Sequence, residues 1–314
     1  MNKKVVVLGG GNGMSTLLRG LKQFPLDLTS IVSVCDDGKS TGILRKEFNT
    51  PAVGDARRVL IALSETEPLF EKMFNYRFET EGYLNGHAVG NFLIQAMTDI
   101  TGSMSEGIKA LGKVLNLKGN VIPLTENGDI TLVAEMMDGK IIEGEHLITE
   151  EKGTIKKVYY KKNPEINKQA IQAIIEADLI ILSVGSLYTS IIPNLIPNEI
   201  KQAIKYSKAK IMYICNIMTQ PGETDKYKVS DHINKINEYL DERKVDVVIA
   251  NNGKIDQDII DKYSTLEQKD PVILDEENIK NVEIIGDNLI AIEEGSLRHD
   301  TIKLSLNIFT YLLK

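Results

Sequence analysis

Residues on which disulfide frameworks and zinc sites depend are scarce in this sequence. It has two cysteines, four histidines and no tryptophan among 314 residues. Cys35 and Cys215 each lie near the end of an expected strand, as buried thiols in a reducing cytoplasm do, which argues against a disulfide framework. The four histidines are too widely spaced for a zinc pattern. We therefore expect a fold that depends on neither disulfides nor zinc.

Long apolar runs and basic runs are lacking as well. No apolar stretch approaches the length that spans a membrane, and Met1 to Lys4 lead directly into a strand too short for the core of a secretory signal. The net charge is −7, whereas non-specific nucleic-acid binding needs a positive face. These absences predict a cytoplasmic protein that neither spans a membrane nor binds nucleic acid.

What the sequence does contain is an alternation of apolar runs and amphipathic segments. Strands are expected at 5–8, 30–35, 179–184, 210–215 and 245–250, and helices at about 198–206, 231–242 and 301–313. This alternation predicts an α/β fold in which helices cover both faces of a mainly parallel sheet. With 314 residues, 42% of them hydrophobic, a single three-layer, Rossmann-like domain over residues 1–314 has ample core.

One segment departs from this alternation. Between about 120 and 162, extended runs flank Asp138-Gly139, a dipeptide typical of hairpin turns. We expect a hairpin-rich, antiparallel β insertion over 120–162 within the α/β domain.

The stretch VVVLGGGNGMSTLL at residues 5–18 joins an apolar strand to a helix through four glycines. Glycine has no Cβ, so a ligand can approach the main chain, and the free amides of a helix N-terminus attract anions. The dinucleotide fingerprint G-x-G-x-x-G is met at Gly9 and Gly11 but fails at Met14, and a tight turn that binds nothing is the alternative. The stretch predicts a phosphate site formed by Gly9, Gly10, Gly11, Asn12, Gly13, Met14 and Ser15.

An acidic pair follows the next expected strand. Asp36 and Asp37 stand at about the distance from the glycine loop where a dinucleotide fold places its ribose-binding acid. They predict contact with ribose hydroxyls, or with Mg²⁺ held against a diphosphate, and Gly38 and Ser40 extend the same loop. A helix cap followed by a turn is the alternative for one of the two.

Two further loops carry candidate ligand-binding residues ahead of helices. Gly54 and Asp55 begin one helix, and capping that helix is the alternative role for Asp55. His87 and Asn91 begin another and lie one turn apart on the same face, where a structural hydrogen bond is the alternative. No arrangement of serine, histidine and aspartate can be assigned as a nucleophilic triad, so the catalytic residues stay unassigned.

Polar loops also follow the later expected strands, and one polar segment precedes the last helix. In an open parallel sheet such loops emerge at the carboxyl edge, where ligands bind, so we expect their hydroxyls and amides to line the sugar end of the site. Arg298 suits a phosphate or the acceptors of a uracil edge, while Asp300 is positioned to cap the last helix. The loop candidates are Gly185, Ser186, Tyr188, Thr189, Asn216, Thr219 and Gln220.

Seven motifs together resemble those of the YvcK-type gluconeogenesis factors, the bacterial branch of the CofD-like (2-phospho-L-lactate transferase-like) family. They run from Val5 to about Asp300 and read GGGNGMSTLLRGLK, DDGKSTG, VGDARR, HAVGN, GSLYTSIIPNL, NIMTQPGETD and LRHD. The resemblance implies a Rossmann-like fold and a nucleotide-type ligand, which for the YvcK branch is a UDP-sugar such as UDP-N-acetylglucosamine. It also implies roles in gluconeogenic growth and in cell-wall morphogenesis and cell shape.

These observations leave three hypotheses for function. The leading one is a UDP-sugar-binding regulatory protein, for which we expect a homodimer and a regulatory protein partner. The second follows the CofD branch: a transferase that moves a phosphoryl-linked group from a nucleotide diphosphate donor with Mg²⁺. The third, an NAD(P)-dependent redox enzyme, is disfavoured because the third fingerprint glycine is missing and no clear proton donor accompanies a nicotinamide.

Overall fold

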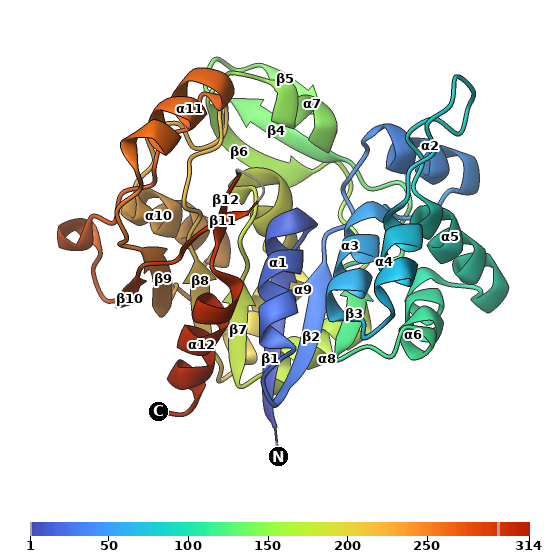
Figure 1. Cartoon of the computed structure of the whole chain (residues 1–314), viewed down its shortest axis with the longest axis horizontal. Coiled ribbons are helices and arrows are strands. Elements are labelled where there is room, and N and C mark those ends of the chain that lie inside the picture. The colour runs from blue at the N-terminus through green and yellow to red at the C-terminus, as the bar shows by residue number, and fades with distance from the viewer. Residues whose placement is uncertain (1, 294–295) are drawn as a thin grey trace.

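A computed structural model describes residues 2–293 and 296–314 and contains a seven-stranded, wholly parallel sheet. The strand order is β10-β9-β8-β7-β1-β2-β3 (Figure 1). The strands are β1 (Lys3–Gly9), β2 (Leu26–Val32), β3 (Asn120–Pro123), β7 (Leu179–Leu182), β8 (Lys210–Ile214), β9 (Val247–Asn251) and β10 (Glu283–Asp287). The predicted α/β fold with a mainly parallel sheet is confirmed.

The central strand β1 shows why the sheet needs helices on both faces. Its residues alternate between two hydrophobic cores: Val5 and Val7 face one core, and Val6 and Leu8 face the other. All four side chains are at most 2% exposed. A strand whose successive side chains are all apolar is stable only when both of its faces are covered.

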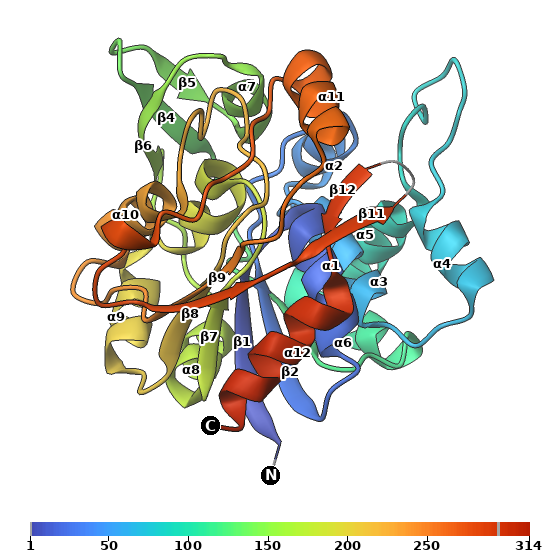
Figure 2. The same ribbon diagram turned by 60° about the vertical axis from the view of Figure 1, so that its left-hand side comes forward.

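Two helical layers supply that cover. The first core includes buried residues of α1 (Gly11–Leu21), α2 (Lys39–Phe48), α3 (Gly54–Leu63), α4 (Pro68–Asn75), α5 (Val89–Thr101), α6 (Met104–Val114) and α12 (Thr301–Leu312). The second includes residues of α8 (Lys168–Glu176), α9 (Asn198–Tyr206) and α10 (Val229–Leu240). Helix α12 packs beside α1, so the last helix lies against the first (Figures 1 and 2).

Two small antiparallel sheets stand apart from the main sheet. One has the order β5-β4-β6, from β4 (Leu132–Met136), β5 (Ile141–Glu143) and β6 (Ile155–Tyr160), with α7 (Glu145–Glu150) between the last two strands. The predicted turn at Asp138-Gly139 joins β4 to β5, and Gly139 has the positive φ, 88°, that favours glycine. The segment predicted as an insertion, 120–162, also contains β3, which pairs with β2 in the main sheet.

The second small sheet and the short helices complete the chain. β11 (Ile290–Glu293) pairs with β12 (Ser296–His299), and α11 (Gln257–Glu267) precedes them. The single-turn helices are the π-helix η1 (Leu187–Ile191) and the 3-10 helices η2 (Ile192–Asn194) and η3 (Glu276–Asn278). In the described part of the chain, no helix is long and apolar enough to cross a bilayer.

The order in which strands are added to the sheet reverses at β1, and this switch point determines where a ligand can bind. β1 pairs with β2 on one side and with β7 on the other. The connections that leave β1 and β7 therefore run to opposite sides, and the loops after these strands form a crevice at the carboxyl edge. The glycine loop and the segment around Gly185 both belong to this edge.

Close packing across the crevice depends on a glycine. A Cβ added to Gly13, in the first turn of α1, would lie 2.4 Å from the carbonyl oxygen of Val184. Because both partners are main chain, neither can rotate away, and only a shift of α1 relative to β7 would make room.

Replacing Gly13 with alanine should therefore destabilise the protein by about 1–3 kcal/mol, the usual cost of overpacking. Gly112→Ala is the matched control, because its added Cβ meets only the flexible side chain of Leu117, at 3.0 Å. In that helix interior alanine should stabilise by up to about 1 kcal/mol. Urea unfolding measures whether each variant raises or lowers the free energy of unfolding. Equal changes in the two variants would contradict the packing argument.

A buried histidine makes the fold sensitive to acid. His232, on α10, is fully buried, its Nδ1 lies 3.0 Å from the hydroxyl of Tyr213, and its ring packs edge-on against Tyr227. Burial lowers the pKa of His232 to about 4. An unfolded chain takes up this proton near pH 6.5, so the stability that neutral His232 contributes is complete above that pH and is lost as the pH falls toward 4.

We expect the stability difference between the native protein and His232→Phe to shrink by about 2–3 kcal/mol between pH 7 and pH 4. The lost hydrogen bond to Tyr213 adds a pH-independent cost, so only the change with pH is diagnostic. Urea unfolding at several pH values measures it, and a constant difference would show that His232 does not titrate as described.

Candidate functional site

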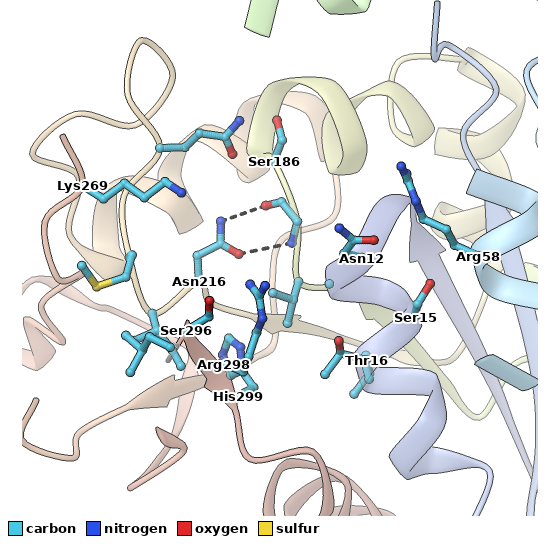
Figure 3. Close-up of a pocket in the computed structure, with 18 of the residues that line it drawn as sticks. Asn12, Ser15, Thr16, Arg58, Ser186, Asn216, Lys269, Ser296, Arg298 and His299 are labelled. Atoms are coloured by element: carbon cyan, nitrogen blue, oxygen red, sulfur yellow. Dashed lines mark hydrogen bonds between the residues drawn. The ribbon is translucent and has the colours of Figure 1, made fainter. Parts of the chain in front are cut away.

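A cavity of about 1040 Å³ lies in the crevice at the carboxyl edge of the sheet. Its walls are the N-terminal half of α1, the start of α3, the loops after β7 and β8, and the hairpin strand β12 (Figure 3). Among the residues predicted from the sequence, those that line it are Asn12, Gly13, Ser15, Gly185, Ser186, Asn216, Thr219, Gln220 and Arg298.

The other predicted residues lie behind or beside this cavity. Tyr188 and Thr189 are at most 3% exposed and belong to η1, beneath the rim. The remaining ones do not line the cavity either: Gly9, Gly10, Gly11, Met14, Asp36, Asp37, Gly38, Ser40, Gly54, Asp55, His87 and Asn91.

Asn216 holds the loop after β7 in place. Its Nδ2 donates to the carbonyl oxygen of Gly185 at 2.8 Å, and its Oδ1 accepts from the amide of Gly185 at 3.2 Å (Figure 3). These two hydrogen bonds connect the loop after β7 to the loop after β8. Asn216 therefore fixes the backbone of Gly185, which faces the cavity.

Ser186 is fully committed to partners within the protein. Its hydroxyl donates to the carboxylate of Glu223 and accepts from the amide and the hydroxyl of Thr189, at 3.0 and 2.8 Å. A hydroxyl has one proton and two lone pairs, so no capacity is left for a ligand. Ser186 shapes the wall and caps η1.

Glu223 connects the loop after β7 to the loop after β8. Its carboxylate accepts from Ser186, from the amide of Tyr188 at 3.4 Å and from Nε2 of Gln220 at 2.6 Å. Burial raises the pKa of Glu223 to about 7, although these hydrogen bonds act in the opposite direction. The sequence analysis did not single out Glu223, although it lies three residues after Gln220 in the same polar loop.

The cavity wall carries more cations than carboxylates, although the whole chain carries −7. Three of these cations are ion-paired: Arg19 with Glu71, Arg58 with Asp55 and Lys269 with Glu267. Among the described lining residues, Glu267 is the single carboxylate. The cations are Arg19, Arg57, Arg58, Lys269 and Arg298. Apart from Arg298, sequence reasoning missed them, because Arg57 and Arg58 lie inside a helix and Lys269 lies in a loop without a recognisable motif.

Arg298 is the least constrained of these cations. It lies on β12, where its backbone pairs with Ala291 of β11, and it is exposed; its guanidinium forms no hydrogen bond or ion pair within the described ranges 2–293 and 296–314. Figure 3 shows its guanidinium between Arg58 on one side and Lys269 on the other. A guanidinium with all its donors available is suited to a phosphate or to planar acceptors.

The neighbours of Arg298 have structural roles. His299 is 7% exposed, its Nε2 lies 3.1 Å from the carbonyl oxygen of Cys215, and burial lowers its pKa to about 4. It is therefore neutral at physiological pH. Asp300 accepts from the amide of Lys303 at 2.9 Å, so the predicted cap of the last helix is confirmed.

The carboxylates of Asp36 and Asp37 accept hydrogen bonds at the starts of two helices. Asp36 accepts from the amide of Gly38 at 2.9 Å and from the hydroxyl of Thr41 at 3.0 Å, while Asp37 accepts from the amide of His146 at 2.8 Å. Both carboxylates thus have partners at the starts of α2 and α7. No group of three potential metal-binding side chains occurs among the described residues. Mg²⁺ held against a diphosphate needs only one or two carboxylates, so contact of this pair with ribose or with Mg²⁺ stays a prediction.

His87 and Asn91 meet at Ser40. The Nδ1 of His87 and the Nδ2 of Asn91 each lie 3.2 Å from the hydroxyl oxygen of Ser40. Both side chains are at most 3% exposed. The sequence grouped His87 with Asn91 correctly, and the structure adds that their shared contact holds the first turn of α2 against α5.

Asp55 lies behind the glycine loop. It is on α3, yet its Oδ2 would be 2.2 Å from a Cβ added to Gly10, the residue before α1. Its Oδ1 accepts from Arg58 at 2.8 Å. Burial raises the pKa of Asp55 to about 6, Arg58 and the amide of Gly11 lower it, and Asp36 raises it.

Comparison with known proteins gives a consistent relationship over nearly the whole chain. The model of the 2-phospho-L-lactate transferase CofD family matches residues 5–290. The gluconeogenesis factor of Halalkalibacterium halodurans is 45% identical over 306 residues, which cover 96% of this chain and 94% of that protein. The gluconeogenesis factor of Bacillus subtilis is 42% identical over 314 residues, covering 99% and 98%.

Solved structures agree with the sequence relatives. The crystal structure of a member of the UPF0052 family from Bacillus halodurans matches with a TM-score of 0.94 and 45% identity, and covers 98% of this chain and 99% of that chain. A second crystal structure from the same organism matches with a TM-score of 0.95 and 44% identity, covering 98% and 100%. The chain therefore belongs to the CofD-like family, in its branch of gluconeogenesis factors.

Proposed function

We propose that the cavity binds a nucleotide sugar, a UDP-sugar such as UDP-N-acetylglucosamine, and that the protein acts by binding this ligand rather than by consuming it. The relatives' name, gluconeogenesis factor, supports a role in growth on gluconeogenic carbon. We further propose that the protein regulates cell shape and cell-wall synthesis.

The observation that carries this proposal is the excess of cations on the cavity wall. The Arg298 guanidinium has no partner in the described ranges, Arg57 donates to the neutral side chain of Asn75, and the other three lining cations are paired with Glu71, Asp55 and Glu267. Several fixed positive groups around a helix N-terminus attract a diphosphate much more strongly than a neutral metabolite. The ligand class that follows is a nucleoside diphosphate derivative.

The sugar end of the ligand fits the loop after β8 and the first residue of β12. Asn216, Gln220 and Ser296 contribute amide and hydroxyl groups to the lining. Buried sugar hydroxyls need both donors and acceptors, and such side chains supply both. Volume is not limiting, because a cavity of about 1040 Å³ exceeds the usual range for drug-sized ligands.

A transferase that moves a phosphoryl-linked group from a nucleotide diphosphate donor is the second candidate. The match to the CofD family model favours it, as does Glu223, a buried carboxylate of raised pKa that contacts two wall residues. Mass spectrometry of the nucleotide after long incubation distinguishes the two functions: an intact UDP-sugar supports binding, and its conversion supports transfer.

A ligand panel should show selective stabilisation by UDP-sugars. Thermal unfolding would be recorded with UDP-N-acetylglucosamine, UDP-glucose, GDP, NAD⁺ and free N-acetylglucosamine. A ligand present at 100 times its Kd adds about 2.7 kcal/mol to the stability of the folded state. Free sugar should have no effect, because it lacks the diphosphate. Stabilisation by NAD⁺ but not by UDP-sugars would contradict the proposal.

Loss of the Arg298 guanidinium should weaken UDP-sugar binding. We expect Arg298→Ala to cost about 1.5–3 kcal/mol of binding free energy, the range for hydrogen bonds to charged groups. Arg298→Lys should not restore affinity, because a point charge cannot form the paired contact. Arg77→Ala removes an arginine outside the lining and is the control. Isothermal titration measures all three, and native affinity in both Arg298 variants would place the phosphate elsewhere.

A further inference from the structure

The N-terminus of α1 already has an anion beside it. The residue before α1 is Gly10, and the helix has neither a side-chain cap nor an acidic residue in its first turn. The carboxylate of Asp55 fills this position from α3: it lies against Gly10 and is stabilised in its charged form by the amide of Gly11. The charge that the helix dipole favours is thus supplied from within the protein.

Asp55 also engages one of the cations of the cavity. Its Oδ1 accepts from Arg58 at 2.8 Å, and the side chain of Arg58 is 31% exposed while that of Asp55 is 12% exposed. Arg58 lines the cavity and Asp55 does not. An anion in the cavity would therefore compete with Asp55 for Arg58 as well as for the field of the helix.

We propose that Asp55 is a built-in competitor of the ligand phosphate: it holds the α1 N-terminus and Arg58 in the free protein, and it must be neutralised or displaced when a diphosphate binds. This inference rests on the proposed function, because it concerns the same cavity. On binding, Arg58 exchanges the carboxylate for a phosphate, and the charge of Asp55, left close to the ligand, opposes binding.

The charges that face Asp55 come from several elements. Arg57 and Arg58 on α3 favour its charged form, whereas Asp36 after β2 and Glu145 on α7 oppose it. Burial among these carboxylates raises the pKa of Glu145 well above its usual range. With Asp55 itself, three carboxyl groups and two arginines meet at this end of the crevice, so a further anion is tolerated best when Asp55 is protonated.

Calorimetric titration of the full chain with UDP-N-acetylglucosamine tests this. Asp55→Asn keeps the shape and one acceptor oxygen, replaces the other oxygen by an amide donor and removes the charge. At pH 7.5 it should bind roughly tenfold more tightly than the native protein. Glu199→Gln, which removes a charge from the exposed start of α9, is the control and should bind as the native protein does.

The pH dependence provides a second measurement. The diphosphate of a UDP-sugar is a diester and does not titrate near neutrality, so changes in affinity report on the protein. Native affinity should rise as the pH falls from 7.5 to 5.5 and approach that of Asp55→Asn, because the pKa of Asp55 is about 6. Glu223 titrates near the same range, so the part of the pH dependence that disappears in Asp55→Asn is the part due to Asp55.

The outcomes separate the two claims. Unchanged or weaker binding by folded Asp55→Asn would overturn the inference and make Asp55 a supporting part of the phosphate site. Absence of binding by every variant at every pH would overturn the proposed function and this inference with it. If Asp55→Asn does not fold, proton uptake by the native protein is measured at pH 6.5 in buffers of different ionisation enthalpy. Uptake that persists in Glu223→Gln, in which the second titrating carboxyl group is removed, supports the inference, and its absence overturns it.

Discussion

The contact between Gly13 and the main chain of Val184 sets the geometry on which the rest of the site depends. It brings the start of α1 against the loop after β7, at the point where the sheet reverses its direction of growth. Asn216 then ties the same loop to the end of β8. The ends of β1, β7 and β8 are thereby held together by one close backbone contact and by the side chain of Asn216, so the cavity is preorganised and little ordering entropy remains for a ligand to lose.

Electrostatics divides this edge of the sheet into two regions. The cavity wall carries five cations, whereas the region behind the glycine loop contains Asp36, Asp37, Asp55 and Glu145. Asp55 and Arg58 form the boundary between them, as the ion pair that spans it. Asn12 and Gly13, in the first turn of α1, line the cavity beside this boundary, so a phosphate bound there lies close to both charges.

Periodicity and turn chemistry were sufficient to predict the parallel sheet and the strand–glycine–helix junction, because the apolar runs and the glycines act locally. They also placed Asn216 and Gln220 at one edge. They could not reveal that Ser186 has no free hydrogen-bonding capacity, since its partner Glu223 is 37 residues away. Capping its own helix was the alternative role for Asp55, but its carboxylate lies at the start of α1, a tertiary contact that no local pattern encodes.

The polar groups near the cavity differ in how free they are to act, and this difference favours binding over catalysis. Ser186 is saturated, Glu223 accepts three hydrogen bonds, and Asp55 is held by Arg58. A nucleophile or general base needs a lone pair directed at the substrate, and these groups direct theirs at the protein. Arg298, in contrast, keeps all its donors for whatever enters. Since a shared fold does not imply a shared reaction, a wall with a free cation and committed acids suits a receptor for a nucleotide sugar better than a transferase.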